Sequence, residues 1–275
     1  MSFHANYALP SEDVQWLVKQ YEEIRFAGGG DIQDKFIPRY DVSLVFHFGL
    51  PPVILQPLAR RLPRFFLAPV IPCANLIKLT EPDTTFVVVC KPTVLSRVAS
   101  ADLSLPCSAY YPLPEKVFAP LWQQLYKAGD FYSRIDAFTL FTRNWHTNDY
   151  AKDCIDRIYD EILDTHGLLP VKEILSRFGM NHRTLQRKFM KRIGVCPKTF
   201  ARIVRVNYLW DISRIQSKAD YQDMVFKGKY YDQAHLIKDF KAITGETPAS
   251  FFRRDRYCVS IMSGKNAELS AGLRQ

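Results

Sequence analysis

The sequence predicts an α+β protein, with an N-terminal β-sandwich or barrel-like domain carrying flanking helices, followed by an all-α domain. Three observations predict this order. Stretches rich in β-branched and aromatic residues lie in the first half, helical periodicity replaces them from residue 150 onward, and one pattern of apolar and turn residues occurs twice in the second half. With 275 residues and 47% hydrophobic side chains, the chain is long enough for two ordinary domains.

The first half combines predicted strands with predicted helices. The expected strands, bounded by Gly and Pro, are residues 41–48, 64–71 and 84–90. Residues 12–26 have a helix-like pattern, and residues 114–127 and 131–145 carry apolar side chains at helical spacing. We therefore expect residues 1–148 to form one domain, with a β core and a helical hairpin over 114–145. The polar segment His146–Asp149 is the expected boundary.

The second half reads as helices throughout. The expected helices are residues 155–167, 171–178, 182–193 and 197–214, with further helices in the second copy of the repeat. The second domain should therefore span residues 149–256. Residues 257–275 are polar and lack a helical apolar stripe beyond Met262, so this tail is expected to be loosely ordered.

The distribution of charge indicates a polyanionic partner for the second domain. The net charge is +9; residues 1–149 contain 14 basic and 14 acidic side chains, whereas residues 150–256 contain 21 and 13. The six cysteines are scattered singly, so we expect free thiols and no metal site. No apolar window reaches the length of a membrane span and the N-terminus lacks the pattern of a secretory signal, which predicts a cytoplasmic protein without a membrane partner.

The internal repeat becomes visible when the chain is aligned with itself at an offset of 51 residues. Both copies have the spacing L-x3-F-x4-G-x2-P-x2-F; the pairs are Leu185 and Leu236, Phe189 and Phe240, Gly194 and Gly245, Pro197 and Pro248, and Phe200 and Phe251. The offset also aligns two good N-cap residues, Asn181 and Asp232. Each copy therefore predicts a short helix, a turn and a capped second helix.

Two such helices with basic and amide side chains at the exposed start of the second are typical of a helix-turn-helix DNA reader. Arg can donate two hydrogen bonds to guanine, Gln can pair with adenine, and a small apolar side chain can touch a thymine methyl group. The expected base contacts are His182, Arg183, Gln186, Arg187, Gln233, Ala234, Ile237 and Lys238. The expected phosphate contacts are Lys188, Lys191, Arg202 and Arg205.

About 100 residues, from Ile155 to Arg254, resemble the C-terminal DNA-binding domain of AraC/XylS-type transcription regulators. The resemblance rests on Tyr230–Lys241 followed by Gly-Glu-Thr-Pro at 245–248, and on Arg183–Phe189 followed by Gly-Val-Cys-Pro at 194–197. It implies base contacts at Arg183, Gln186 and Arg187 in the first reader, and at Gln233, Ala234 and Lys238 in the second.

One residue departs from that family's pattern. The family has Gly directly before the Tyr-x-Asp-Gln run, where this chain has Lys229. If the turn needs a positive φ there, Lys229 reshapes the second turn or strains it. In the first half, residues 46–49 and 86–92 are similar to an uncharacterised domain that precedes such DNA-binding domains in bacterial regulators, which implies ligand sensing or dimerisation.

The combined expectation is a sequence-specific bacterial transcription regulator that binds double-stranded DNA. The N-terminal domain would bind a small-molecule effector or form a homodimer, and RNA polymerase would be a partner if the protein activates. His47 could line a pocket or serve as a structural histidine. No catalytic motif is present, so we expect no enzyme activity and no cofactor. The alternatives are a DNA-binding protein without sequence preference and a DNA-repair methyltransferase with an AraC-like reader.

Overall fold

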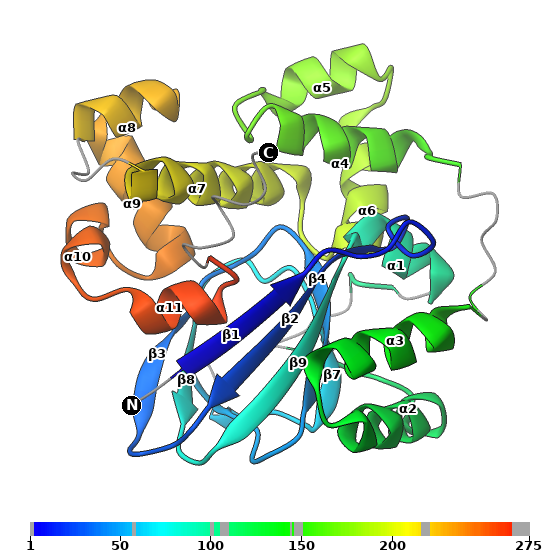
Figure 1. Ribbon diagram of the computed structural model, residues 1–275. Coiled ribbons are helices and arrows are strands. Elements are labelled where there is room, and N and C mark those ends of the chain that lie inside the picture. The colour runs from blue at the N-terminus through cyan, green and yellow to red at the C-terminus, as the bar shows by residue number, and fades with distance from the viewer. Residues whose placement is uncertain are drawn as a thin grey trace.

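The computed structural model describes residues 3–56, 59–99, 102–104, 110–143, 145, 151–215 and 221–265. It confirms the α+β class: antiparallel sheets and their helices come first, and a helical region follows (Figure 1). The expected boundary at residues 146–149 lies outside the described residues. Among the described residues, no helix is both long and apolar enough to cross a bilayer.

Two antiparallel sheets form the N-terminal region. The six-stranded sheet has the order β1 (Phe3–Ala8), β2 (Val18–Phe26), β9 (Asp83–Cys90), β4 (Val42–His47), β7 (Phe65–Ala68) and β10 (Tyr111–Pro112). The four-stranded sheet has the order β3 (Ile32–Phe36), β8 (Asn75–Leu79), β5 (Val53–Gln56) and β6 (Arg60–Arg61). The three predicted strands correspond to β4, β7 and β9, the inner part of the larger sheet.

The larger sheet is covered on both faces. Every residue of β4 is buried. Leu44 and Phe46 belong to a core that also contains Leu121 and Phe138 of the helical hairpin, whereas Val45 and His47 point to a cavity between the two sheets. Successive strand residues alternate between faces, so one strand supplies both the core and the cavity.

The predicted helical hairpin is confirmed as α2 (Glu115–Ala128) and α3 (Phe131–Thr142). Asp130 caps α3 by accepting hydrogen bonds from the backbone nitrogens of Tyr132 and Ser133. A further short helix, α1 (Pro92–Val98), follows β9 directly, with Pro92 in its first turn.

The prediction of a helix over residues 12–26 is wrong. Residues 12–17 form turns, and residues 18–26 are β2, which pairs with β1 on one side and β9 on the other. Two contributions favour the strand over the local helical pattern. The backbone forms hydrogen bonds to two neighbouring strands, and Val18, Tyr21 and Phe26 are all buried in the strand conformation.

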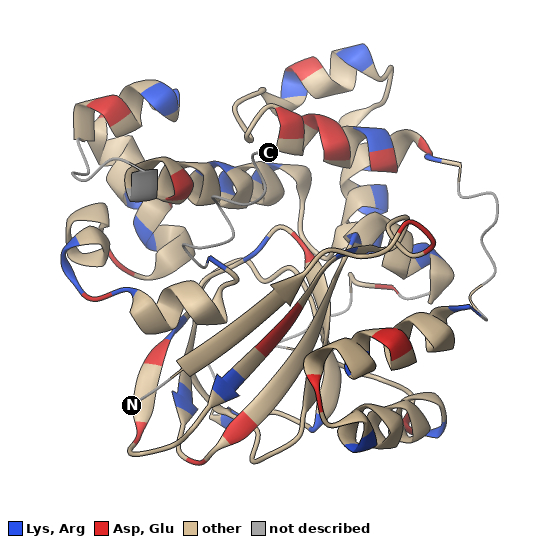
Figure 2. Ribbon diagram, viewed as in Figure 1, with Lys and Arg blue, Asp and Glu red and all other residues tan. Residues whose placement is uncertain are grey.

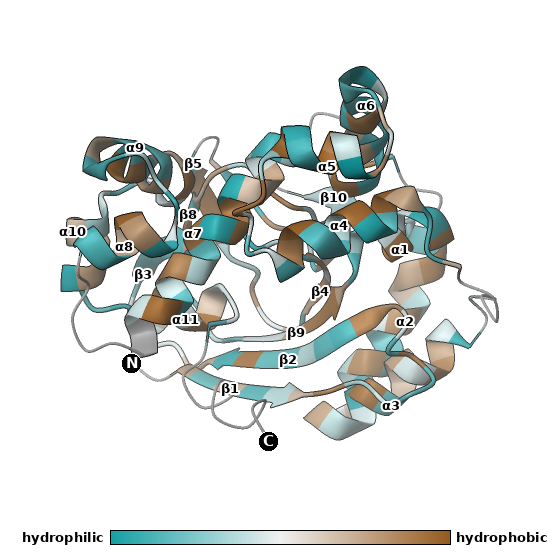
Figure 3. Ribbon diagram, turned by 90° about the horizontal axis from the view of Figure 1, so that it is seen from above, coloured by the Kyte–Doolittle hydropathy of each residue, from teal (hydrophilic) through white to brown (hydrophobic). Residues whose placement is uncertain are grey.

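The helices of the second half lie where the periodicity places them. They are α4 (Cys154–Asp164), α5 (Val171–Arg177), α6 (His182–Ile193), α7 (Pro197–Ile215), α8 (Tyr221–Lys227), α9 (Gln233–Thr244) and α10 (Pro248–Arg253). Helices α6 and α9 lie toward opposite ends of α7 in both views (Figures 1 and 3). The two repeat copies are therefore α5–α6 and α8–α9, joined by α7.

The tail is ordered at its start, contrary to expectation. Residues 257–262 form α11 (Tyr257–Met262), in which Val259, Ile261 and Met262 are buried. Ile261 and Met262 pack with residues of β1, β3 and β8, so apolar contacts with both sheets order this short helix. Residues 266–275 lie outside the described residues.

Candidate nucleic-acid interface

Helix α6 is fixed by its own sequence at both ends. The Asn181 side chain accepts a hydrogen bond from the Thr184 backbone nitrogen (2.8 Å), and Gly194 ends the helix with φ +92°. Leu185, Phe189 and Ile193 form its buried face. The opposite face is therefore left to solvent.

The predicted contact residues of the first reader all lie on that exposed face: His182, Arg183, Gln186, Arg187, Lys188 and Lys191. Helix α6 carries five Lys and Arg residues and no acidic residue. Acidic residues are concentrated instead on α4 (Figure 2). The positive potential therefore comes from the reader helix, as binding to a phosphate backbone requires.

Helix α9 repeats this construction. Asp232 accepts a hydrogen bond from the His235 backbone nitrogen (2.7 Å), and Gly245 ends the helix with φ +76°. Of the predicted base contacts, Gln233, Ala234 and Lys238 are exposed and Ile237 is half-buried. The second reader therefore also presents its N-terminal turn to solvent.

The two turns differ in length by one residue. In the first, Gly179 has φ +58°, and Met180 N donates to Leu175 O; in the second, Lys229 has φ +49°, and Tyr230 N donates to Val225 O. Lys229 thus occupies the left-handed position of Gly179 at an offset of 50, whereas the reader helices repeat at 51. The additional residue is Tyr231, whose side chain is 93% exposed. The sequence repeat shows the helices but conceals this insertion.

Two of the predicted phosphate contacts are engaged inside the domain. The Arg202 guanidinium donates to the buried Asp239 carboxylate of α9 (3.0 Å), and Arg205 donates to the Gly167 carbonyl (2.7 Å) and covers the Tyr230 ring. Arg202 therefore joins α7 to the second reader, and Arg205 joins α7 to the turn after α4. Charge alone could not distinguish these residues from Lys188 and Lys191, which are exposed.

Helix α7 spaces the readers. Its 19 residues span about 28 Å at about 1.5 Å per residue. That length is close to the roughly 34 Å between successive major-groove faces of DNA.

Each reader is also tied to the N-terminal region. Arg192 at the end of α6 donates to the Thr93 carbonyl of α1 (2.6 Å) and to the Asp153 carboxylate (2.7 Å). Burial alone would raise the pKa of Asp153, but the hydrogen bond and charge of Arg192 lower it. At the second reader, Arg254 pairs with Asp34 of β3 at 2.9 Å. No local pattern of residues indicates these contacts, because their partners are distant along the chain.

A cavity lies between the two sheets of the N-terminal region. It has a volume of about 130 Å³ and mostly apolar walls. His47 lines it and is almost fully buried, so this residue is both a pocket residue and hydrogen-bonded within the fold, to Asp83 and Thr85.

Residues 174–254, which contain most of α5 and all of α6 to α10, match a family model described as a helix-turn-helix domain. This region is an AraC-type helix-turn-helix domain. In the chain, this domain follows the two β-sheets and the α2–α3 hairpin.

Three solved structures resemble the chain weakly over most of its length. ToxT from Vibrio cholerae is 11% identical with a TM-score of 0.46, over 92% of this chain and 98% of that chain. ToxT from the same species, bound to an unsaturated fatty acid, is 10% identical with a TM-score of 0.44, over 92% and 95%. The AraC-like transcriptional activator CuxR is 9% identical with a TM-score of 0.30, over 82% and 91%. No curated protein matches the chain.

Proposed function

We propose that the protein is a sequence-specific transcription regulator that places α6 and α9 in successive major grooves of double-stranded DNA. The observation that carries this proposal is the pair of capped helices held at opposite ends of the 19-residue α7, each with its polar N-terminal turn exposed. Helices docked in this way read base edges with their first residues.

The side chains supply the chemistry for reading bases. In α6, Arg183 and Arg187 can donate two hydrogen bonds to guanine, and Gln186 can pair with adenine, with His182 beside them at the helix start. In α9, the residues with the same roles are Gln233 and Lys238 for hydrogen bonds and Ala234 and Ile237 for thymine methyl groups.

Phosphate contacts belong to Lys188 and Lys191, which are exposed on α6. Arg202 and Arg205 act as positioning residues in this proposal, because their guanidinium groups bind Asp239 and Gly167. Their replacement would disturb the mutual orientation of the readers rather than remove a phosphate contact.

The N-terminal region is the proposed regulatory unit, with the cavity as its effector site. Residues 37–41 connect the cavity to the AraC-type domain. On one side Arg39 pairs with Glu22, and both line the cavity. On the other side the Pro38 carbonyl accepts a hydrogen bond from Asn207 of α7 (2.9 Å), and Tyr159 of α4 donates to Asp41 (3.2 Å). A ligand that shifts this segment would change the support of α4 and α7.

Two further partners complete the proposal. The α2–α3 hairpin exposes Val117, Tyr132 and Leu140, which supports a homodimer through this hairpin. RNA polymerase would be a partner if the protein activates transcription.

The position of Cys90 disfavours this residue as the nucleophile of a methyltransferase. Cys90 is fully buried, and burial raises the pKa of its thiol, whereas a reactive nucleophile needs a lowered pKa and access. Cys107 lies outside the described residues.

The direct test is selection of binding sites from a random pool of double-stranded DNA at about 150 mM salt, where non-specific attraction is weak. Two enriched blocks about one helical turn apart are expected. One block would mean that only one reader specifies bases. No enrichment, together with salt-steep binding to any DNA, would favour the protein without sequence preference.

Two neighbouring residues of α6 give a matched comparison. Arg187→Ala should cost about 1 to 3 kcal/mol on the selected site and relax the preference for one base. Lys188→Ala should weaken binding to selected and random DNA alike, with a smaller salt dependence. Binding curves at several salt concentrations measure both effects. An equal loss on all sequences from Arg187→Ala would contradict base reading by Arg187.

A further inference from the structure

The size of the cavity limits its ligand. Its walls come from both sheets and from α11, and they are mostly apolar side chains such as Val45, Ile54, Phe66 and Val87. A dry apolar cavity of about 150 Å³ holds one benzene molecule. At about 130 Å³, this cavity fits a body of roughly six to ten non-hydrogen atoms once its side chains adjust.

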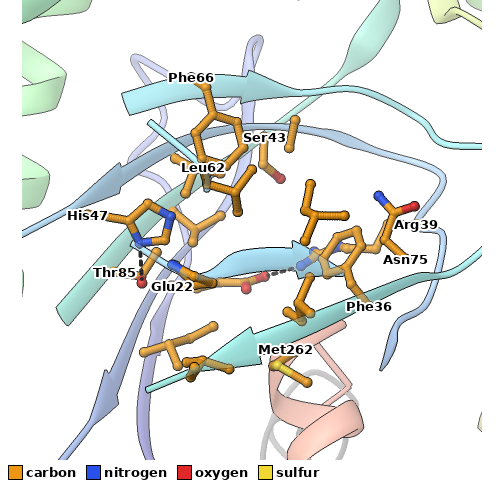
Figure 4. A pocket seen from close by; sticks show the side chains of 18 of the residues that line it. Glu22, Phe36, Arg39, Ser43, His47, Leu62, Phe66, Asn75, Thr85 and Met262 are labelled. Atoms are coloured by element: carbon orange, nitrogen blue, oxygen red, sulfur yellow. Dashed lines mark hydrogen bonds and ion pairs between the residues drawn. The ribbon is translucent and has the colours of Figure 1, made fainter. Parts of the chain in front are cut away.

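One polar atom points into this apolar space without a partner. Figure 4 shows His47 at one end of the cavity and Arg39 with Asn75 at the other. The His47 side chain is 4% exposed, and its Nε2 has no hydrogen-bond partner among the described residues. A buried polar atom without a partner costs free energy, which a ligand that pairs with it would recover.

The hydrogen bond of the other ring nitrogen, Nδ1, determines whether Nε2 donates or accepts. Nδ1 lies 2.6 Å from Asp83 Oδ2, and this carboxylate also accepts hydrogen bonds from Thr85 Oγ1 and the Gly49 backbone nitrogen, both at 2.8 Å. Burial would raise the pKa of Asp83, but these donors lower it, so the carboxylate is ionised. A hydrogen bond to this carboxylate selects the tautomer of His47 that carries its proton on Nδ1, and in that tautomer Nε2 is an acceptor.

The remaining charges of the cavity disfavour an anion. Arg39 Nη1 binds the Glu22 carboxylate at 2.8 Å, so this guanidinium is compensated within the wall. Asp83 adds a negative charge beside His47. A ligand carboxylate would share the cavity with the Glu22 carboxylate, which lines it, and would lose its hydration, whereas a neutral donor meets an acceptor.

We propose that this cavity binds a small neutral effector, an apolar body bearing one hydroxyl group, whose hydroxyl donates a hydrogen bond to His47 Nε2. The inference rests on the proposed function, because it names the effector class of the regulatory unit.

Three probes that share a 4-methylphenyl body test the proposal on the full chain by isothermal titration calorimetry; the phenol and the hydrocarbon match in size, and the carboxylate is larger. They are 4-methylphenol, 1,4-dimethylbenzene and 4-methylbenzoate. We expect 4-methylphenol to bind about tenfold more tightly than 1,4-dimethylbenzene, because the hydrocarbon leaves Nε2 unpaired, and we expect 4-methylbenzoate to bind most weakly.

Two variants assign the effect to His47 and to the cavity. His47→Asn retains a donor near the Nδ1 position for Asp83 but removes the acceptor in the cavity, so 4-methylphenol should fall to the affinity of 1,4-dimethylbenzene. Ala68→Leu fills the cavity from β7 and should abolish binding of both. Thermal unfolding verifies that each variant is folded, and the ranking of probes on the wild-type chain decides the matter if His47→Asn does not fold.

Several results would overturn the proposal: no binding by any probe, equal affinity for the phenol and the hydrocarbon, or a preference for 4-methylbenzoate. Retention of the phenol preference by a folded His47→Asn variant would do the same. DNA-site selection is performed without any probe. The calorimetry therefore tests the ligand proposal alone, and the site selection tests the DNA-binding proposal alone.

Discussion

Among single residues, Lys229 has a backbone conformation that disfavours a side chain. Its φ of +49° lies in the left-handed region, where the equivalent residue of the first reader is Gly179. The second turn therefore has the same left-handed conformation as the first, and the Cβ atom of Lys229 makes this conformation strained. The sequence alone indicated that strain or reshaping would follow.

Lys229→Gly should stabilise the protein by about 1 kcal/mol, because Gly adopts positive φ without the clash of a Cβ atom. Lys229→Ala is the matched control, since it removes the charge and keeps the Cβ atom. Urea unfolding of the three proteins measures the difference. Equal stability of the Gly and Ala variants would show that the left-handed turn costs nothing.

At the scale of elements, the β4–β9 pair is tied at one end by Asp83. This carboxylate accepts hydrogen bonds from His47 at the end of β4 and from Gly49 just beyond it. A Cβ atom on Gly49 would lie 2.4 Å from the Pro82 carbonyl oxygen, so only Gly allows this approach. The tie joins residues that are 36 positions apart.

The lowered pKa of Asp83 predicts a dependence of stability on pH. Because the folded-state pKa lies below the ordinary value of 3.8, Asp83 stabilises the fold above that value, and the contribution disappears as the pH falls through the folded-state pKa. Asp83→Asn should therefore cost about 2 kcal/mol at neutral pH and progressively less in acid.

Thermal unfolding of both proteins across the acidic range measures this difference. Asp31→Asn is a suitable control, because Asp31 forms a surface ion pair with Lys78 and its side chain is 55% exposed. A constant gap between wild type and Asp83→Asn from neutral to strongly acidic pH would contradict the assignment.

At the scale of the whole molecule, the N-terminal region and the AraC-type domain share one interface. Asn207 of α7 is buried and donates both to Pro38 and to Ile203 of its own helix, and Ile37 donates to Ser263 beside α11. Burial of these polar links makes each one costly to break. The two regions should therefore resist local opening together.

Asn207→Ala should reduce protection from hydrogen exchange in both regions, over residues 36–41 as well as along α7, because it leaves the Pro38 carbonyl without its donor. Ser213→Ala is the matched control on the same helix, since its hydroxyl donates only to Leu209 within α7. Exchange followed by mass spectrometry compares the two. Loss confined to α7 in both variants would show that the regions open independently.

The reader helices could be predicted from sequence because their signals are local: apolar residues at helical spacing, Asn181 and Asp232 as caps, and Gly at the ends. The helical hairpin and the inner strands follow from the same local patterns. The remaining features depend on contacts between residues that are distant in sequence. Residues 18–26 became a strand through two neighbouring strands, and residues 257–262 became a helix through contact with the smaller sheet. The pairs Arg202–Asp239 and His47–Asp83 join residues that are distant in sequence, and only folding brings such partners together.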